Sequence, residues 1–160
     1  MNIRPLIEID YQIVASIYKK GIDTGIATFE TEVPNWNDWN KKFILNCRFV
    51  VEIDSIVVGW SALSLVSDRK VYSGVVENTI YIDPNYQGRN IGKLLLKHHI
   101  TESEKLGFWT LQAAIFPQNK ASITLHKSCR FRIIGFREKI AKRNGIWHDN
   151  ILMERRSNLF

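Results

Sequence analysis

The stretch with the most structural information reads Tyr81-Ile82-Asp83-Pro84-Asn85-Tyr86-Gln87-Gly88-Arg89-Asn90-Ile91-Gly92-Lys93-Leu94-Leu95. A strand pattern precedes it and a helix pattern closes it, so two glycines and Asn90 stand where the chain must turn. Glycine and asparagine both tolerate a positive φ, and such a turn can direct several backbone N–H groups and a helix N-terminus at one anion. A pyrophosphate is the ligand that this arrangement favours; an ordinary glycine-containing loop is the alternative.

Two other nucleotide-binding motifs do not fit this stretch. A P-loop follows Gly-x-x-x-x-Gly-Lys-Ser/Thr, but here Gln87 replaces the first glycine and Leu94 replaces the hydroxyl residue that would hold magnesium. A dinucleotide fingerprint requires Gly-x-Gly-x-x-Gly after a strand, and the glycines do not have that spacing. An anion site at this turn would therefore have no residue that holds magnesium in the usual way, and no metal ion is expected there.

Length and composition are those of an ordinary globular protein. The 160 residues can bury a substantial core, and we expect residues 1–160 to form a single domain. A hydrophobic share of 45% and a charged share of 24% exclude disordered, collagen-like and disulfide-scaffold proteins. The apolar runs are short and the first residues do not form a signal peptide, so we expect a cytoplasmic protein without membrane contact.

Charge and cysteine content leave some alternatives open. The net charge of +6 suits an anionic small-molecule cofactor as well as nucleic acid. Cys47 and Cys129 are far apart in the sequence and form no CxxC pair, so we expect two reduced, packed thiols, with a disulfide as the alternative.

Hydrophobic periodicity and turn residues predict a mixed α/β sheet with helices on its faces. The expected strands are residues 3–6, 49–53, 56–65, 75–82, 109–115, 133–136 and 147–153. The expected helices contain residues 13–18, 36–44, the segment from Gly92 to about residue 106, and residues 119–128. Gly21 and Gly25 should end the first helix, Asn35 should cap the second, and Gly107 should follow the third.

The stretch from residue 81 to residue 95 resembles the acetyl-CoA motif, Gln/Arg-x-x-Gly-x-Gly/Ala, of the GCN5-related N-acetyltransferases (GNAT). Residues 119–122 and 125–131 resemble the family's next motif, and the element order is similar too. Within the family the chain most resembles the phosphinothricin and methionine sulfoximine/sulfone acetyltransferases, through residues 28–32, 76–82 and 147–149. The resemblance implies a GNAT-type acyl-CoA N-acyltransferase fold, with a splayed central mixed sheet flanked by helices.

Two positions depart from the family pattern. Asn90 stands where the motif usually has its first glycine, and asparagine is the best substitute in a left-handed conformation. Arg130 stands where the family usually has glycine, which would strain the backbone if that position needs a positive φ.

The reaction implied by the resemblance moves an acetyl group from acetyl-CoA to a primary amine. An amine with a pKa near about 10.4 is mostly protonated at neutral pH, so the site needs a base and donors for the oxyanion. Glu77 is the first candidate for the base. It lies among apolar residues of a strand expected to be central, where burial would raise its pKa. A carboxylate that points to solvent at a strand end is the alternative.

Two histidines are further candidates for catalysis. The resemblance gives His148 a role at the substrate site, with packing on the last strand as the alternative. His126 occupies a position where many relatives carry a tyrosine thought to protonate the leaving thiolate; contact with CoA or helix packing is the alternative. We expect structural roles for His98 and His99.

The resemblance also implies the residues that bind acetyl-CoA. Backbone groups of Tyr81 and Ile82 should bind the pantetheine arm, with the Ile82 amide as oxyanion donor, and Asn119 should contact the same arm. The pyrophosphate should be held by the turn, whose residues are Gln87, Gly88, Arg89, Asn90, Ile91, Gly92 and Lys93. Arg89, Lys93 and Lys127 are candidates for the 3′-phosphate side; a solvated basic face is the alternative.

The expected acceptor is a small amino-acid-like amine. Thr28, Phe29 and Glu30 should line its pocket, and Arg69 or Lys70 should pair with its carboxylate, with surface loops as the alternative. A protein N-terminus or a polyamine is the alternative acceptor. The resemblance implies a homodimer, with the aromatic second helix and the C-terminal strands as candidate interface.

Two further hypotheses assign the chain no acetyltransferase activity. One is a nucleic-acid binder that uses the basic run Arg130, Arg132, Arg137, Lys139, Lys142 and Arg143, although no aromatic platform or known reading motif accompanies it. The other is a CoA-binding protein that has lost catalysis through the departures at Asn90 and Arg130.

Overall fold

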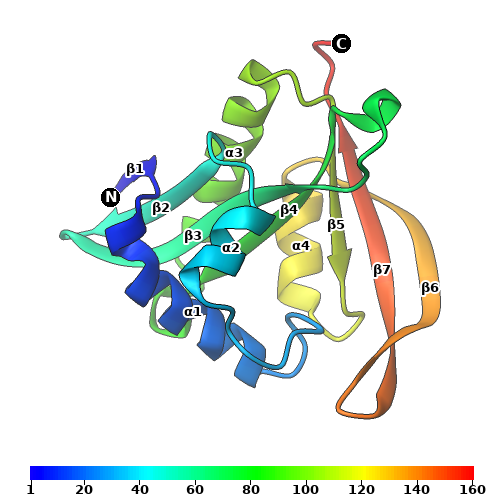
Figure 1. The fold of residues 1–160 in the computed structure, drawn as a ribbon, viewed down its shortest axis with the longest axis horizontal. Coiled ribbons are helices and arrows are strands. Elements are labelled where there is room, and N and C mark those ends of the chain that lie inside the picture. The colour runs from blue at the N-terminus through cyan, green and yellow to red at the C-terminus, as the bar shows by residue number, and fades with distance from the viewer.

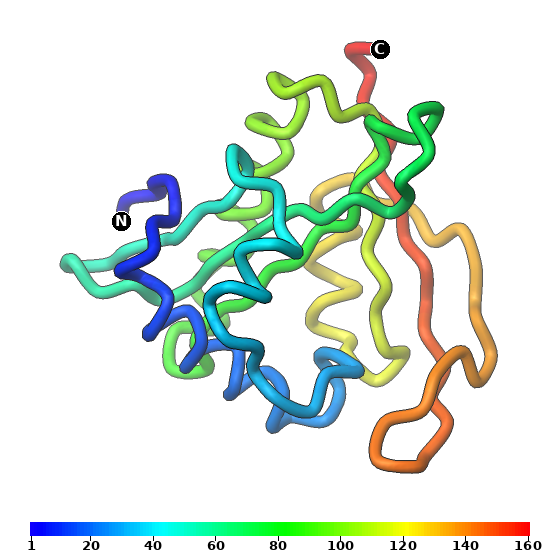
Figure 2. Tube along the Cα trace, viewed as in Figure 1, coloured from blue at the N-terminus to red at the C-terminus, as the bar shows by residue number.

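A seven-stranded mixed sheet runs through the computed structural model, which describes residues 1–160 (Figures 1 and 2). In chain order the strands are β1 (Asn2–Pro5), β2 (Arg48–Ile53), β3 (Ile56–Leu65), β4 (Val75–Ile82), β5 (Thr110–Ile115), β6 (Arg132–Arg143) and β7 (Ile146–Arg156). The helices are α1 (Tyr11–Asp23), α2 (Trp36–Lys42), α3 (Ile91–Lys105) and α4 (Lys120–Ser128), and short 3₁₀ turns cover Glu8–Asp10, Lys70–Tyr72 and Pro84–Tyr86. The predicted element order and the mixed α/β class are confirmed.

The strands lie side by side in the order β1-β2-β3-β4-β5-β7-β6. Every neighbouring pair is antiparallel except β4 and β5, which are parallel and joined through α3. Helices α1 and α2 cover one face of the sheet, and α3 and α4 cover the other (Figure 1). Strand β4 is therefore central, as the sequence predicted. None of the helices has the length and apolar character needed to cross a bilayer.

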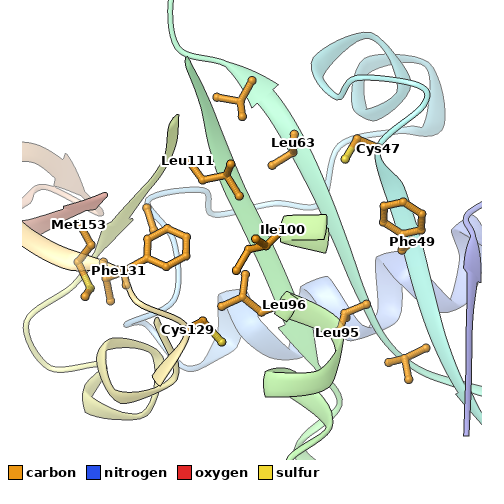
Figure 3. Close-up of a cluster of buried hydrophobic side chains, with 14 of the residues drawn as sticks. Cys47, Phe49, Leu63, Leu95, Leu96, Ile100, Leu111, Cys129, Phe131 and Met153 are labelled. Atoms are coloured by element: carbon orange, nitrogen blue, oxygen red, sulfur yellow. The ribbon is translucent and has the colours of Figure 1, made fainter. Parts of the chain in front are cut away.

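Each face of the sheet has its own apolar core. Figure 3 shows the larger one, in which Leu95, Leu96 and Ile100 of α3 pack with Leu63 and Leu111 of the sheet. Both cysteines are free and buried in this core, so the expectation of two packed thiols is confirmed.

The core under α1 and α2 is rich in aromatic rings. Trp39 and Trp60 are fully buried, and their rings meet edge to face at 5.6 Å. Trp60 in turn stacks on Tyr81 at 5.1 Å. Because large aromatic side chains bury the most apolar area per residue, these contacts fix α1 and α2 against β3 and β4. Trp39 of α2 therefore belongs to the core of its own chain.

The local signals at the ends of the helices are mostly confirmed. The Asn35 side chain accepts a hydrogen bond from the backbone N–H of Asp38 at 3.0 Å, as an N-cap should. Gly107 follows α3 with φ +87°, the left-handed conformation of a C′ residue.

The prediction that Gly21 ends the first helix is wrong, because α1 continues to Asp23. Gly21 is required for another reason: a Cβ atom there would lie 2.4 Å from Cε1 of Tyr81, so only glycine allows the Tyr81 ring to pack against the helix. Gly25 follows the helix with φ +72°. The predicted strand at residues 133–136 is also too short, because β6 continues to Arg143.

A close contact between Gly74 and Trp109 fixes the position at which the pairing of β4 with β5 begins. The carbonyl of Gly74, just before β4, accepts hydrogen bonds from the backbone N–H groups of Trp109 and Thr110 at 2.9 and 3.1 Å. A Cβ atom at Gly74 would lie 2.1 Å from Cε3 of the Trp109 ring. The Trp109 ring therefore packs on the bare backbone of Gly74.

Replacing Gly74 with alanine is expected to lower the free energy of unfolding by about 1–3 kcal/mol, because the Trp109 ring must move away from the new methyl group. Chemical denaturation measures this change. Gly135→Ala is the control, since a Cβ atom there meets nothing within 4 Å, and we expect it to leave the free energy of unfolding nearly unchanged. Equal stability of the two variants would contradict the packing described for Gly74.

Candidate active site

The two parallel strands separate partway along their length. Strands β4 and β5 pair only from Val75–Thr110 to Glu77–Gln112, after which β4 stays paired with β3 up to Ile82 and β5 stays paired with β7. A cleft of about 900 Å³ lies at this separation. Its wall comes from the end of α1 and the loop after it, the end of α2, the second half of β4, the end of β5, the start of α3 and one side of α4. The splayed sheet implied by the resemblance is therefore present.

The backbone of β4 presents alternate residues to this separation. The N–H of Asp83, the residue just after β4, donates to the carbonyl of Val58 on β3 at 2.8 Å. By alternation, the odd-numbered residues of β4 direct their backbone groups at β3. The N–H of Ile82 consequently faces the cleft, as predicted. The N–H and C=O groups of Tyr81 face β3 instead, although Tyr81 itself lines the cleft, so its contact with the pantetheine arm stays a prediction.

The turn before α3 has the geometry of an anion site. Gly88 has φ +76° and Asn90 has φ +59°, so the left-handed conformation expected for Asn90 is confirmed. The first helical hydrogen bond of α3 runs from the N–H of Leu94 to the carbonyl of Asn90, and none of the N–H groups of residues 88–93 donates to a protein acceptor. Six consecutive donors at a helix N-terminus can accommodate a phosphate group.

Most of the predicted acetyl-CoA residues lie at the cleft. Gln87, Gly88, Asn90, Ile91, Gly92, Lys93 and Asn119 are part of its wall. Asn119 caps α4 by accepting from the N–H of Ser122 at 3.1 Å, and its amide nitrogen donates to the carbonyl of Ile26 at 3.4 Å. Arg89 and Lys127 are exposed outside the cleft wall, with the Arg89 guanidinium over the Tyr86 ring at 5.2 Å.

Glu77 occupies the last position at which β4 and β5 are paired, beside the cleft. Val76 and Ile80 pack in the core under α3, so alternation along the strand directs Glu77 toward the face covered by α1 and α2. Burial raises the pKa of the Glu77 carboxyl, and the charges of Lys42 and Arg137 partly offset that rise. The predicted desolvation of Glu77 is confirmed; its role as the base stays a prediction.

His126 belongs to a buried hydrogen-bond network. The amide nitrogen of Asn78 lies 3.1 Å from Nε2 of His126, and the amide oxygen lies 3.0 Å from Nδ1 of His99. Because an amide nitrogen only donates, the proton of neutral His126 must be on Nδ1, which lies 2.8 Å from the carbonyl of Ser122. Burial lowers the pKa of both histidines, that of His99 to about 3. The network therefore joins β4, α3 and α4 through neutral rings.

His148 lies on β7 and packs edge-on against two aromatic rings. Its ring centre is 5.2 Å from that of Phe116 and 6.3 Å from that of Phe29. Phe29 and Phe116 are themselves in contact at 4.6 Å, and both line the cleft. His148 therefore supports the wall of the cleft from behind.

The residues predicted for the acceptor divide into two groups. Thr28, Phe29 and Glu30 line the cleft, as expected. Arg69 and Lys70 are exposed and are not part of its wall. The structure does not bring them to the cleft. Their segment comes just before the end of β4 that is paired with β5, whereas the cleft begins at the other end of that pairing, beyond Glu77.

Sequence reasoning did not identify two residues of the site. Asn78 follows Glu77 on a buried strand, and a polar residue in such a pattern is a signal of a buried network. Lys42 lies at the end of α2, and no sequence motif points to it. It reaches the cleft because α2 packs over the sheet face that carries Glu77.

Comparison with known proteins agrees with this geometry. The model of the Acetyltransferase (GNAT) family matches residues 16–131. The phosphinothricin N-acetyltransferase of Streptomyces viridochromogenes is 28% identical over 93% of this chain and 84% of its own. The L-methionine sulfoximine/L-methionine sulfone acetyltransferase of Salmonella typhimurium is 31% identical over 66% of this chain and 61% of its own.

A solved structure has the same fold. The phosphinothricin acetyltransferase of Sinorhizobium meliloti, solved in complex with acetyl-CoA, superimposes with a TM-score of 0.87 over 97% of this chain and 87% of its own, at 27% identity. The chain therefore belongs to the GNAT acetyltransferase family. It is an acetyltransferase with relatives that are named for phosphinothricin and for methionine sulfoximine and sulfone.

Proposed function

We propose that this enzyme transfers an acetyl group from acetyl-CoA to the primary amine of a small amino-acid-like acceptor, with residues 1–160 acting as one domain. One observation carries the proposal: the desolvated carboxyl of Glu77 lies at the same cleft as the unpaired N–H groups of residues 88–93. A base for an ammonium group and a site for a pyrophosphate are the two features that this reaction needs. The names of the relatives support the acceptor class.

The proposed steps follow from the positions of these groups. When bound, acetyl-CoA supplies a thioester carbonyl as the electrophile. Glu77 accepts a proton from the acceptor ammonium, directly or through a water molecule, and the freed lone pair of the amine attacks the carbonyl carbon. The N–H of Ile82 donates to the oxyanion that forms. The bond from carbon to sulfur then breaks and CoA leaves as a thiolate. The second proton of the amine nitrogen passes through solvent to that thiolate, which leaves the amide and CoA thiol as products.

The two histidines have supporting parts in this scheme. The Nδ1 proton of His126 is engaged by the Ser122 carbonyl, which weighs against its predicted role as the acid. A thiol with a pKa near about 8.5 is a tolerable leaving group without one. His148 holds Phe29 at the acceptor end of the cleft and contributes to the substrate site in that way.

A panel of acceptors tests the proposed function. Purified enzyme is mixed with acetyl-CoA and, one at a time, phosphinothricin, methionine sulfoximine, methionine sulfone, a polyamine and a peptide with a free N-terminus. We expect thiol release with at least one of the amino-acid acceptors and little with the others. Turnover confined to the polyamine or the peptide would overturn the acceptor class and keep the acetyltransferase reaction.

We further propose that two copies associate through the β6–β7 hairpin. Strand β6 is at the edge of the sheet, and the hairpin exposes Ile133, Phe136, Ile140, Ile146 and Trp147. An exposed apolar edge of this kind favours a second copy. The aromatic residues of α2 are less suitable than the sequence predicted, because Trp39 is fully buried in its own chain.

Phe136→Asp is expected to convert a dimer into a monomer, because a carboxylate would replace a ring that is 60% exposed on this edge. Light scattering coupled to size-exclusion chromatography measures the mass. The control is Ile9→Asp, a similar change at an 83% exposed residue beside β1 at the opposite edge of the sheet. A wild-type monomer, or a dimer that persists in Phe136→Asp, would contradict the proposed interface.

A further inference from the structure

Three lysines line the cleft, and two of them already have a partner or a site. Lys20 is paired with Asp83 at 2.6 Å. Lys93 lies in the first turn of α3, among the unpaired N–H groups. The third, Lys42, comes from α2. Its function is not explained by the binding of acetyl-CoA.

Lys42 is held at the acceptor end of the cleft by its helix. The guanidinium of Arg48 is almost completely buried and donates to the carbonyls of Asn40, Phe43 and Ile44, which are the last acceptors around the end of α2. The end of the helix is thereby fixed over the sheet face that carries Glu77.

The contacts of Lys42 leave its ammonium group accessible. Its one acidic partner is Glu30, and the two charged groups are 3.6 Å apart, longer than a good hydrogen bond. Both side chains are about half exposed, so the attraction between them is weak. A ligand carboxylate can replace Glu30 at little cost.

We propose that Lys42 binds the carboxylate of the acceptor amino acid and so directs its amine toward Glu77. This inference rests on the proposed function and adds the residue that selects acceptors with a carboxylate. It also gives a role to the one cation of the cleft wall near the carboxyls of Glu30 and Glu77; Arg137, whose charge also acts on Glu77, is not part of that wall. An acceptor that has an ammonium group but no carboxylate would leave Lys42 without a binding partner.

The test compares one acceptor in two forms. Lys42→Met and wild type are assayed with the best amino-acid acceptor and with its carboxamide, at a pH well above the acid limb of the rate profile. We expect Lys42→Met to raise KM for the free acid about tenfold, because the variant loses a partly exposed charge-assisted hydrogen bond to the substrate. The kcat value should stay within about twofold of wild type. The carboxamide should react equally with both enzymes. The control is Lys41→Met, which removes the same charge from α2 at an exposed residue outside the cleft wall.

The outcomes separate the two proposals. Equal losses for the acid and the carboxamide, or unchanged kinetics with both, would overturn the role of Lys42 while the proposed function stands. An effect of Lys41→Met as large as that of Lys42→Met would overturn it too, since the effect would be a general one of charge. If wild type acetylates no amino acid but does acetylate a polyamine or a peptide, both proposals fail.

Discussion

Glu77→Gln is expected to lower kcat/KM about 10²–10⁴-fold, the usual contribution of a positioned general base. Glutamine has almost the same shape but cannot accept the proton of the acceptor ammonium. The rate of thiol release from acetyl-CoA, with saturating acceptor and then with varied acceptor, measures the loss. The affinity for acetyl-CoA should stay close to that of wild type, because Glu77 lies at the far end of the cleft from the turn at residues 88–93.

The pH profile gives this prediction a second readout. Burial raises the pKa of Glu77, so kcat/KM of wild type should fall as the pH drops through a value above the ordinary carboxyl range. That acid limb should be missing from the residual activity of Glu77→Gln. Glu138→Gln is the control, since this carboxylate is exposed on β6. Activity of Glu77→Gln within a few-fold of wild type, with the acid limb intact, would show that another group takes the proton.

Asn90→Val is expected to weaken acetyl-CoA binding about tenfold or more. Asn90 has φ +59°, and a β-branched residue in the left-handed region costs roughly 1–3 kcal/mol, where about 1.4 kcal/mol is a factor of ten. The variant can relieve that strain by rotating the turn, which would disperse the N–H groups of residues 88–93. Titration calorimetry with acetyl-CoA measures the dissociation constant.

Asn90→Gly separates the backbone effect from loss of the asparagine side chain. Glycine adopts a positive φ readily, so we expect the dissociation constant of Asn90→Gly to stay within a few-fold of wild type. Thermal unfolding of both variants checks that they are folded. Equal weakening by valine and glycine would assign the effect to the amide side chain and refute the backbone account.

The structure shows how Arg130, the second departure from the family pattern, is accommodated. Arg130 has φ +68° and follows the end of α4, where its N–H donates to the carbonyl of Lys127 at 3.0 Å. The next N–H, from Phe131, returns to the carbonyl of His126 at 3.0 Å, which completes a helix C-terminal motif that usually has glycine. The arginine side chain is exposed, so the substitution adds backbone strain without a steric clash.

Features of the site that are formed by one continuous segment of the chain could be predicted from the sequence. The turn before α3 follows from glycine, asparagine and the change of period from strand to helix. The burial of Glu77 follows from its apolar neighbours on β4. Features that depend on the packing of two distant segments could not be predicted in this way. Lys42 reaches the cleft only because α2 packs over the sheet. Arg69 and Lys70 lie away from the cleft because of the point at which β4 and β5 separate. The direction of the Tyr81 backbone also depends on a second segment, because the register with β3 decides which N–H and C=O groups of β4 face the cleft.

The most direct test of the whole account is the mass of the acceptor after incubation with enzyme and acetyl-CoA. We predict that one of phosphinothricin, methionine sulfoximine or methionine sulfone gains one acetyl group on its amine nitrogen, at a rate that depends on Glu77. If the enzyme binds acetyl-CoA but leaves all three unchanged, the proposed acceptor class is wrong.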